Sequence, residues 1–212
     1  MTKLFDNISP KNKEILLKKL EASTLSYSKG VKVLSNMSNR SKENFIAVIE
    51  SGSAHNIKTD YNGMSTILEE YNEGDIFGSI ISSINSEENN VITKEPSRIT
   101  YIDYNKITNS EISNEKYYII FYKNLLEIIS EIVAAKNERI NILTKRSTRD
   151  KLLEFFNTLS VQKSSRVFTI PYSFTDLASY LCVDRSAMTR EIKNLKEEGF
   201  IKITGKRITL NY

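Results

Sequence analysis

Cysteine and histidine are scarce in this chain of 212 residues, which has one of each and no tryptophan. A single cysteine excludes an intrachain disulfide, a four-cysteine iron–sulfur cluster and a cysteine-based zinc site. A single histidine excludes a metal centre with several imidazole ligands. Most metal-dependent and histidine-dependent chemistry is therefore excluded. We expect no metal site and no cofactor, and we assign no catalytic residues.

Long apolar segments are also missing. No apolar run approaches the roughly 20 residues that a membrane-spanning helix needs, and the first residues lack the apolar region of a secretory signal. Apolar residues still make up 40% of the chain, which is enough for a packed core. We expect a cytoplasmic protein without a membrane partner, folded as one large domain or two small ones.

Charge is distributed unevenly along the chain. Residues 145–212 hold 13 Lys and Arg against 7 Asp and Glu, a net charge of +6, whereas residues 1–144 hold 17 against 19, a net charge of −2. A basic module at one end of a chain is typical of proteins that bind a polyanion, and nucleic acid is the leading candidate. A chance excess of basic residues is the alternative.

The first part of the chain, to about residue 109, has the pattern of a short helix followed by strands. Ser9 and Pro10 suit the cap and the first turn of the helix. Apolar or β-branched runs then alternate with turns that carry Gly or Asn, at residues 44–50, 54–59, 64–69, 76–84 and 98–104. This spacing favours an antiparallel sandwich or roll.

A long helix is predicted over residues 114–144, with apolar residues that recur every seven positions. Its a/d seam consists of Ile119, Tyr122, Leu126, Ile129, Val133, Lys136, Ile140 and Leu143. Such a seam favours pairing with a second chain, and Lys136 would tune that pairing at some cost in stability. A core helix within one chain is the alternative.

Two short helices follow in the basic region. Ser173 begins a capping box before the predicted helix 174–181, and Asp184 can cap a second helix, 185–198, which Gly199 ends. Two helices joined by a tight turn form a helix-turn-helix, whose second helix enters the major groove of DNA. The predicted hairpin of residues 200–204 and 207–210 would add a wing.

The side chains on the exposed face of the second helix suit DNA recognition. Arg pairs bidentately with guanine, Ser and Thr contact bases or phosphates, and Lys contacts phosphates. We expect base reading by Arg185, Ser186, Thr189 and Arg190. We expect phosphate contacts from Ser173, Thr175, Lys193, Lys206 and Arg207.

The stretch LASYLCVDRSAMTREIKNLKEEGFI, together with the wing, resembles the winged helix-turn-helix of the CRP/FNR family of bacterial transcription regulators. The resemblance covers nearly the whole chain and implies an α+β fold. An N-terminal antiparallel, jelly-roll-like β-roll (1–113) would sense an effector, a long helix (114–146) would dimerise, and residues 147–212 would bind DNA. The implied partners are palindromic double-stranded DNA, a second copy of the chain, RNA polymerase and an unidentified small-molecule effector.

The chain departs from the family pattern at two positions of the predicted helix-turn-helix. Arg185, Ser186 and Arg190 fall at the family's base-reading positions, where Ser186 replaces a frequent Glu. Cys182 replaces a frequent Gly at the turn and would need a left-handed backbone. Cys182 could also act as a redox switch, and the alternative is a small turn residue that faces the core.

The sequence argues against cyclic AMP as the effector. By the resemblance, Glu is expected after Gly78, where Ser79 stands, and an Arg-Ser pair is expected where Asn89 and Asn90 stand. A buried phosphate without a fixed cation is poorly compensated. The candidate effector pocket consists of Gly78, Ser79, Tyr118 and Tyr122. Core packing explains the tyrosines equally well.

Other functions need residues that the sequence does not bring together. His55 could bind a haem or sense pH, but its setting in a predicted strand is typical of an ordinary sheet histidine. A ligand-sensing module with a vestigial DNA domain is the alternative to a regulator. An enzyme comes last, because no segment supplies a nucleophile, a base and an orienting group.

Overall fold

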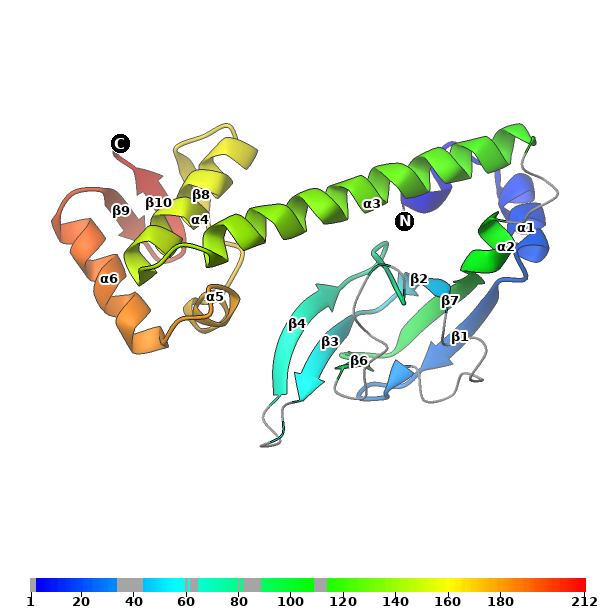
Figure 1. Ribbon diagram of the computed structural model, residues 1–212, viewed down its shortest axis with the longest axis horizontal. Helices are drawn as coiled ribbons and strands as arrows, with labels where there is room; N and C mark the ends of the chain where they lie inside the picture. Colours follow the sequence, from blue (N-terminus) through cyan, green and yellow to red (C-terminus); the bar gives the residue numbers. More distant parts are fainter. Residues whose placement is uncertain are drawn as a thin grey trace. The chain divides into compact units, whose positions relative to one another are not determined.

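The computed structural model describes residues 3–33, 44–59, 61, 65–79, 81, 89–108 and 114–212. These residues form two compact units, 1–130 and 131–212, and the helix α3 (Lys116–Leu143) contributes to both. The first unit also contains η1 (Lys3–Phe5), α1 (Pro10–Lys19), β1 (Ser23–Tyr27), β2 (Phe45–Ser51), β3 (Ala54–Thr59), β4 (Ser65–Tyr71), β5 (Ile76–Gly78), β6 (Asn89–Thr93), β7 (Ser97–Asp103) and α2 (Tyr104–Thr108) (Figure 1).

The strands of the first unit make two antiparallel sheets. One has the strand order β1-β7-β2-β5, and the other has the order β4-β3-β6. A single apolar cluster joins them, since it takes Phe45, Ala47 and Ile99 from the first sheet and Ala54 and Val91 from the second. The predicted antiparallel β-roll is therefore confirmed.

Three strand predictions differ from the structure. The strands β1 and β6 were not predicted, because their residues are mostly polar and are held by backbone pairing to β7 and β3. The predicted strand 76–84 is too long, since β5 ends at Gly78 where the Ile81 amide donates to the Gly78 carbonyl at 3.1 Å. Residues 80 and 82–84 of that predicted strand lie outside the described residues, as do residue 60 and residues 62–63 between the predicted strands 54–59 and 64–69.

The first half of α3 packs within the first unit. The Phe121 ring lies 6.0 Å from the ring of Phe5 in a stacked arrangement. The Asn124 side chain donates to the carbonyl oxygens of Leu4 at 3.2 Å and Asp6 at 2.9 Å. The Tyr118 hydroxyl donates to the Ile107 carbonyl of α2. These bonds satisfy backbone groups of the N-terminal segment and of α2, and they attach both to the helix.

The second unit has the elements of a winged helix-turn-helix. After the end of α3 it contains α4 (Thr148–Gln162), β8 (Val167–Thr169), α5 (Phe174–Tyr180), α6 (Arg185–Glu197), β9 (Ile201–Thr204) and β10 (Arg207–Leu210). The strands form one antiparallel sheet with the order β8-β10-β9. A second apolar core lies among these elements and includes Ile142 from the last turn of α3. The predicted C-terminal winged helix-turn-helix is confirmed.

No helix among the described residues combines the length and the apolar character that crossing a membrane requires.

Candidate nucleic-acid interface

The helix α6, the second helix of the helix-turn-helix, begins at a side-chain cap. Asp184 has an extended backbone, and its Oδ1 atom accepts from the Ala187 amide at 2.9 Å and from the Ser186 hydroxyl at 2.6 Å. The Ser186 hydrogen bond, followed by the Ala187 one, holds the pKa of the Asp184 carboxyl below its ordinary value. The same chemistry begins α5, where Ser173 accepts from the Asp176 amide at 3.1 Å. Both caps agree with the sequence-based predictions.

The turn between α5 and α6 depends on Cys182. Its φ of 50° lies in the left-handed region, as the sequence predicted for a position where Gly is frequent. The side chain is exposed, so the alternative that it faces the core is wrong. The core beneath the turn is filled by Leu177 and Leu181, both fully buried. The Lys151 ammonium donates to the Leu181 carbonyl at 3.1 Å, which attaches the turn to α4.

The two faces of α6 differ sharply in burial. Met188, Ile192 and Leu195 are buried in the second core, at 0%, 8% and 0% exposure. The opposite face exposes Arg185, Ser186, Thr189, Arg190 and Lys193. Three of the five are cationic, and all recur at helical spacing, so they form one continuous polar surface along the helix. This surface contains all four predicted base-reading residues.

Hydrogen bonding distinguishes the arginines from the hydroxyls on this face. The Ser186 hydroxyl donates to Asp184, and the Thr189 hydroxyl donates to the Arg185 carbonyl at 2.8 Å. Their protons are therefore engaged within the helix. No hydrogen bond or ion pair involves the guanidinium of Arg185 or Arg190 within the part of the chain that the structure describes. The two arginines thus keep their full donor forks for a ligand.

The wing carries two further cations. Gly205 has a φ of 59° at the turn between β9 and β10, and Lys206 and Arg207 follow it as exposed residues. The Ile170 amide donates to the Lys206 carbonyl at 2.9 Å, which ties the turn to the end of β8. Lys193 lies 3.6 Å from Glu197 in an exposed i,i+4 pair. Thr175 is exposed, whereas the Ser173 hydroxyl is engaged in its cap.

The candidate effector residues lie in two groups. Gly78 approaches β2 so closely that a Cβ there would lie 2.2 Å from the Phe45 carbonyl oxygen, and the Ser79 hydroxyl accepts from the Phe45 amide at 3.0 Å. Tyr118 and Tyr122 pair on α3, with ring centroids 5.6 Å apart. Each group therefore has a packing role of its own.

A polar cluster inside the roll was not predicted from the sequence. The Asn56 side chain is only 1% exposed, and its amide donates to Glu69 at 3.4 Å. Glu69 also accepts from the Tyr71 hydroxyl. Only the pairing of β3 with β4 brings these residues together, and no sequence motif marks them.

His55 lies on β3, with Nδ1 3.4 Å from the Glu70 carboxylate. Burial, with a contribution from Lys94, lowers the pKa of the imidazole below its ordinary value, although Glu70 opposes the shift. Among the described residues, no three His, Cys, Asp or Glu side chains are placed to hold a metal ion.

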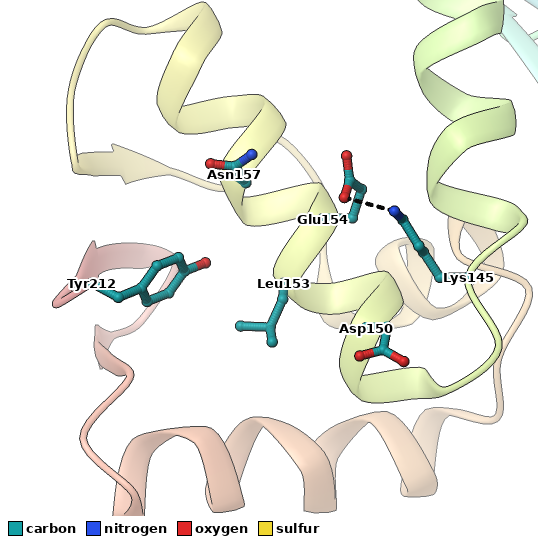
Figure 2. A pocket seen from close by; sticks show the side chains of 6 residues that line it. All are labelled: Lys145, Asp150, Leu153, Glu154, Asn157 and Tyr212. Carbon is teal, nitrogen blue, oxygen red and sulfur yellow. Dashed lines mark ion pairs between the residues drawn. The ribbon is translucent and has the colours of Figure 1, made fainter.

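A surface hollow of about 330 Å³ lies in the second unit, between α4, the end of α3 and the C-terminal residue (Figure 2). Its lining consists of Lys145, Asp150, Leu153, Glu154, Asn157 and Tyr212. The Lys145 ammonium pairs with the Glu154 carboxylate at 3.1 Å across one side. None of the predicted site residues lines the hollow, and its charged groups are neutralised in part by each other.

Comparison with known proteins assigns residues 150–211 of the second unit to a domain family. Residues 150–211 match the model of the Crp-like helix-turn-helix domain. The regulatory protein HlyX of Actinobacillus pleuropneumoniae is 27% identical over 92 residues, which are 41% of this chain and 38% of HlyX. The match thus spans well under half the length of this relative.

Two solved structures share the fold over nearly the full chain. A CooA variant from Carboxydothermus hydrogenoformans aligns with a TM-score of 0.66 at 18% identity, covering 100% of this chain and 92% of CooA. The catabolite activator protein of Thermus thermophilus aligns with a TM-score of 0.52 at 15% identity, covering 99% of this chain and 94% of that protein. The domain match thus shows a Crp-like helix-turn-helix domain at residues 150–211, and the two solved structures show that the chain shares their fold.

Proposed function

We propose that the protein is a sequence-specific DNA-binding transcription regulator that acts as a homodimer on a palindromic operator. Residues 147–212 read the DNA, residues 114–146 dimerise and residues 1–113 sense the signal. Such a regulator works in the cytoplasm, where bacterial DNA lies, and RNA polymerase is a candidate partner. This proposed function requires no catalytic group.

The observation that carries the proposal is the exposed face of α6. Its buried side holds the helix on the domain core, so the side with Arg185 and Arg190 is presented to solvent with both guanidinium forks available. A guanidinium fork matches the O6 and N7 acceptors of guanine in the major groove. Ser186 and Thr189 keep acceptor lone pairs toward the bases, although their protons are engaged.

The phosphate contacts would come from the edges of this surface. Lys193 extends along α6, and Lys206 and Arg207 lie at the wing. Thr175 is an exposed residue in the first turn of α5, close to Ser173, which caps that helix. Contacts of this kind fix the register of a domain on the duplex without reading its sequence.

The α3 seam supports the homodimer. Ile119, Leu126, Val133 and Ile140 are 57%, 58%, 50% and 55% exposed, at successive heptad positions along one line of the helix. The seam is completed by Tyr122, Ile129, Lys136 and Leu143, of which Lys136 is exposed and the others half-buried. A second α3 would cover this line. Two recognition helices would then reach half-sites about 34 Å apart.

Control by cyclic AMP is not part of the proposal. Ser79 accepts from a backbone amide of β2 and supplies no cation, and Asn90 is a neutral residue on β6. β2 packs directly against Gly78. A small-molecule effector of other chemistry, bound near Gly78, Ser79, Tyr118 and Tyr122, remains our expectation.

A titration of the Arg190→Ala variant against duplex DNA at fixed salt tests the proposal. The variant should lose about 1–3 kcal/mol of specific affinity and relax the preference at one base pair. Lys163→Ala is the control, since Lys163 is an exposed cation that follows α4 and lies outside the predicted contacts. Equal losses in the two variants would contradict a base-reading role for Arg190.

A ligand-sensing module with a vestigial DNA domain is the second candidate. It predicts little salt-dependent binding of wild-type protein to any duplex, whereas a regulator should lose affinity steeply as salt rises. The exposed cationic face of α6, which carries Arg185, Arg190 and Lys193, favours the regulator.

A further inference from the structure

One side chain of α4 connects three parts of the DNA-reading unit. The Arg149 Nη1 atom lies 3.0 Å from Glu191 and 2.9 Å from Glu198, and Nη2 donates to the second oxygen of Glu198. The guanidinium carbon also lies 5.1 Å from the centre of the Phe200 ring. Arg149 therefore contacts the middle of α6, its C-cap residue and the residue that leads into β9.

We call the contacts of Arg149 with Glu191, Glu198 and Phe200 the Arg149 clamp. Its hydrogen bonds are directional, whereas the apolar packing around α6 is not. The burial of Met188, Ile192 and Leu195 holds α6 on the core without any directional bond. A bidentate guanidinium–carboxylate pair has a fixed plane and fixed distances. The Arg149 side chain is 31% exposed and Glu191 is 21% exposed, so this pair is partly shielded from water, whereas Glu198 is 46% exposed.

A second polar contact joins α4 to the helix-turn-helix at a different place. Lys151 holds the turn before α6 through the Leu181 carbonyl. The clamp holds the opposite end of the helix, at Glu198. Lys151 thus attaches α4 to the turn before α6, and Arg149 attaches α4 to the middle and the C-cap of α6.

We propose that Arg149 is a positioning residue that sets the orientation of α6 for base reading. The proposal rests on the proposed function, since it assigns the geometry of that same DNA-reading surface. Arg149 is not itself on the solvent-facing side with Arg185 and Arg190, so it acts through Glu191 and Glu198.

The Glu198→Gln variant separates this role from simple electrostatics, because the two predict opposite signs. Removing a negative charge from a DNA-binding unit should tighten binding to every duplex. Loss of the clamp should instead weaken binding to the specific duplex by about five- to 30-fold, with binding to a scrambled duplex unchanged or tighter. The matched control is Glu197→Gln, which makes the same charge change on the same helix but pairs with Lys193 rather than Arg149.

The measurement is a fluorescence anisotropy titration of the full chain at fixed salt, with the duplex that wild-type protein selects and a scrambled duplex of equal length. Glu197→Gln should bind both duplexes as tightly as wild type or more tightly. Arg149→Lys should recover part of the specific affinity lost in Arg149→Gln, since Lys keeps the charge but not the fork. If Glu198→Gln behaves like Glu197→Gln on both duplexes, the positioning role is wrong.

Amide hydrogen exchange of the DNA-free protein gives a readout that does not depend on DNA. The clamp predicts faster exchange in α6 and β9 of Glu198→Gln than of Glu197→Gln, with the first unit unchanged. If wild-type protein prefers no duplex, the proposed function fails. The exchange rates of the two variants then test on their own whether the clamp holds α6 and β9 in place. Equal exchange in the two variants would then overturn it.

Discussion

The dimer seam of α3 can be tested by one substitution with a matched control. Val133 is 50% exposed on the seam, and Val161 is 71% exposed at the end of α4. Changing either residue to Ala removes two carbons from an exposed position of a helix. Both variants gain about 0.5 kcal/mol of helix propensity within the chain, so that effect cancels in the comparison.

The magnitude follows from the surface that pairing would bury. Two methylene-sized groups contribute about 1.6 kcal/mol when fully buried, and about half of that surface is still available on Val133. Because each dimer contains the residue twice, Val133→Ala should weaken dimerisation by about 1.6 kcal/mol, or about 15-fold in Kd. Val161→Ala should leave the Kd unchanged.

Sedimentation equilibrium over a range of protein concentrations measures the two constants directly. The seam predicts a dimer for wild type and Val161→Ala, with a shift toward monomer for Val133→Ala alone. A Kd that is the same for both valine variants would refute the reasoning, and so would a wild-type monomer at all concentrations.

Three further substitutions test the local structure. Gly78→Ala should lower the free energy of unfolding by at least about 2 kcal/mol in urea denaturation, because its Cβ would lie 2.2 Å from the Phe45 carbonyl oxygen; an unchanged midpoint would contradict this close approach. Cys182→Gly should raise the free energy of unfolding by up to about 1 kcal/mol and raise the melting temperature with it, since Gly adopts the left-handed backbone of the turn without steric cost. The pKa of Asp184 is held low by the hydroxyl of Ser186 and by the Ala187 amide, so its charge stabilises the fold above the unfolded pKa and this contribution is lost as the pH falls through the folded value. The stability difference between wild type and Asp184→Asn should therefore shrink below about pH 4, and a difference that stays constant with pH would argue against the cap.

The features predicted well from the sequence are those fixed by neighbouring residues. Ser9, Ser173 and Asp184 were expected to cap helices, and each accepts from an amide three residues on. The left-handed turn at Cys182 was also expected, because Cys182 stands where the family that the sequence resembles often has Gly. Caps and turns use local hydrogen bonds, so a short sequence window contains all of their partners.

The features that were missed depend on partners far along the chain. Strand β1 has a mostly exposed polar sequence and exists because it pairs with β7, more than 70 residues away. The Arg149 clamp joins residues 42 and 49 positions apart, and no motif connects them. The exposure of Cys182 could not be predicted either, because it depends on Leu177 and Leu181 filling the core beneath the turn.

The most direct test of the central claim is to sequence the genomic fragments that the purified protein retains at physiological salt. Our account predicts one enriched motif with two-fold symmetry, whose half-site centres lie about one helical turn of DNA, roughly 34 Å, apart. Retention of fragments in proportion to their abundance, or a motif without two-fold symmetry, would contradict a dimeric sequence-specific regulator.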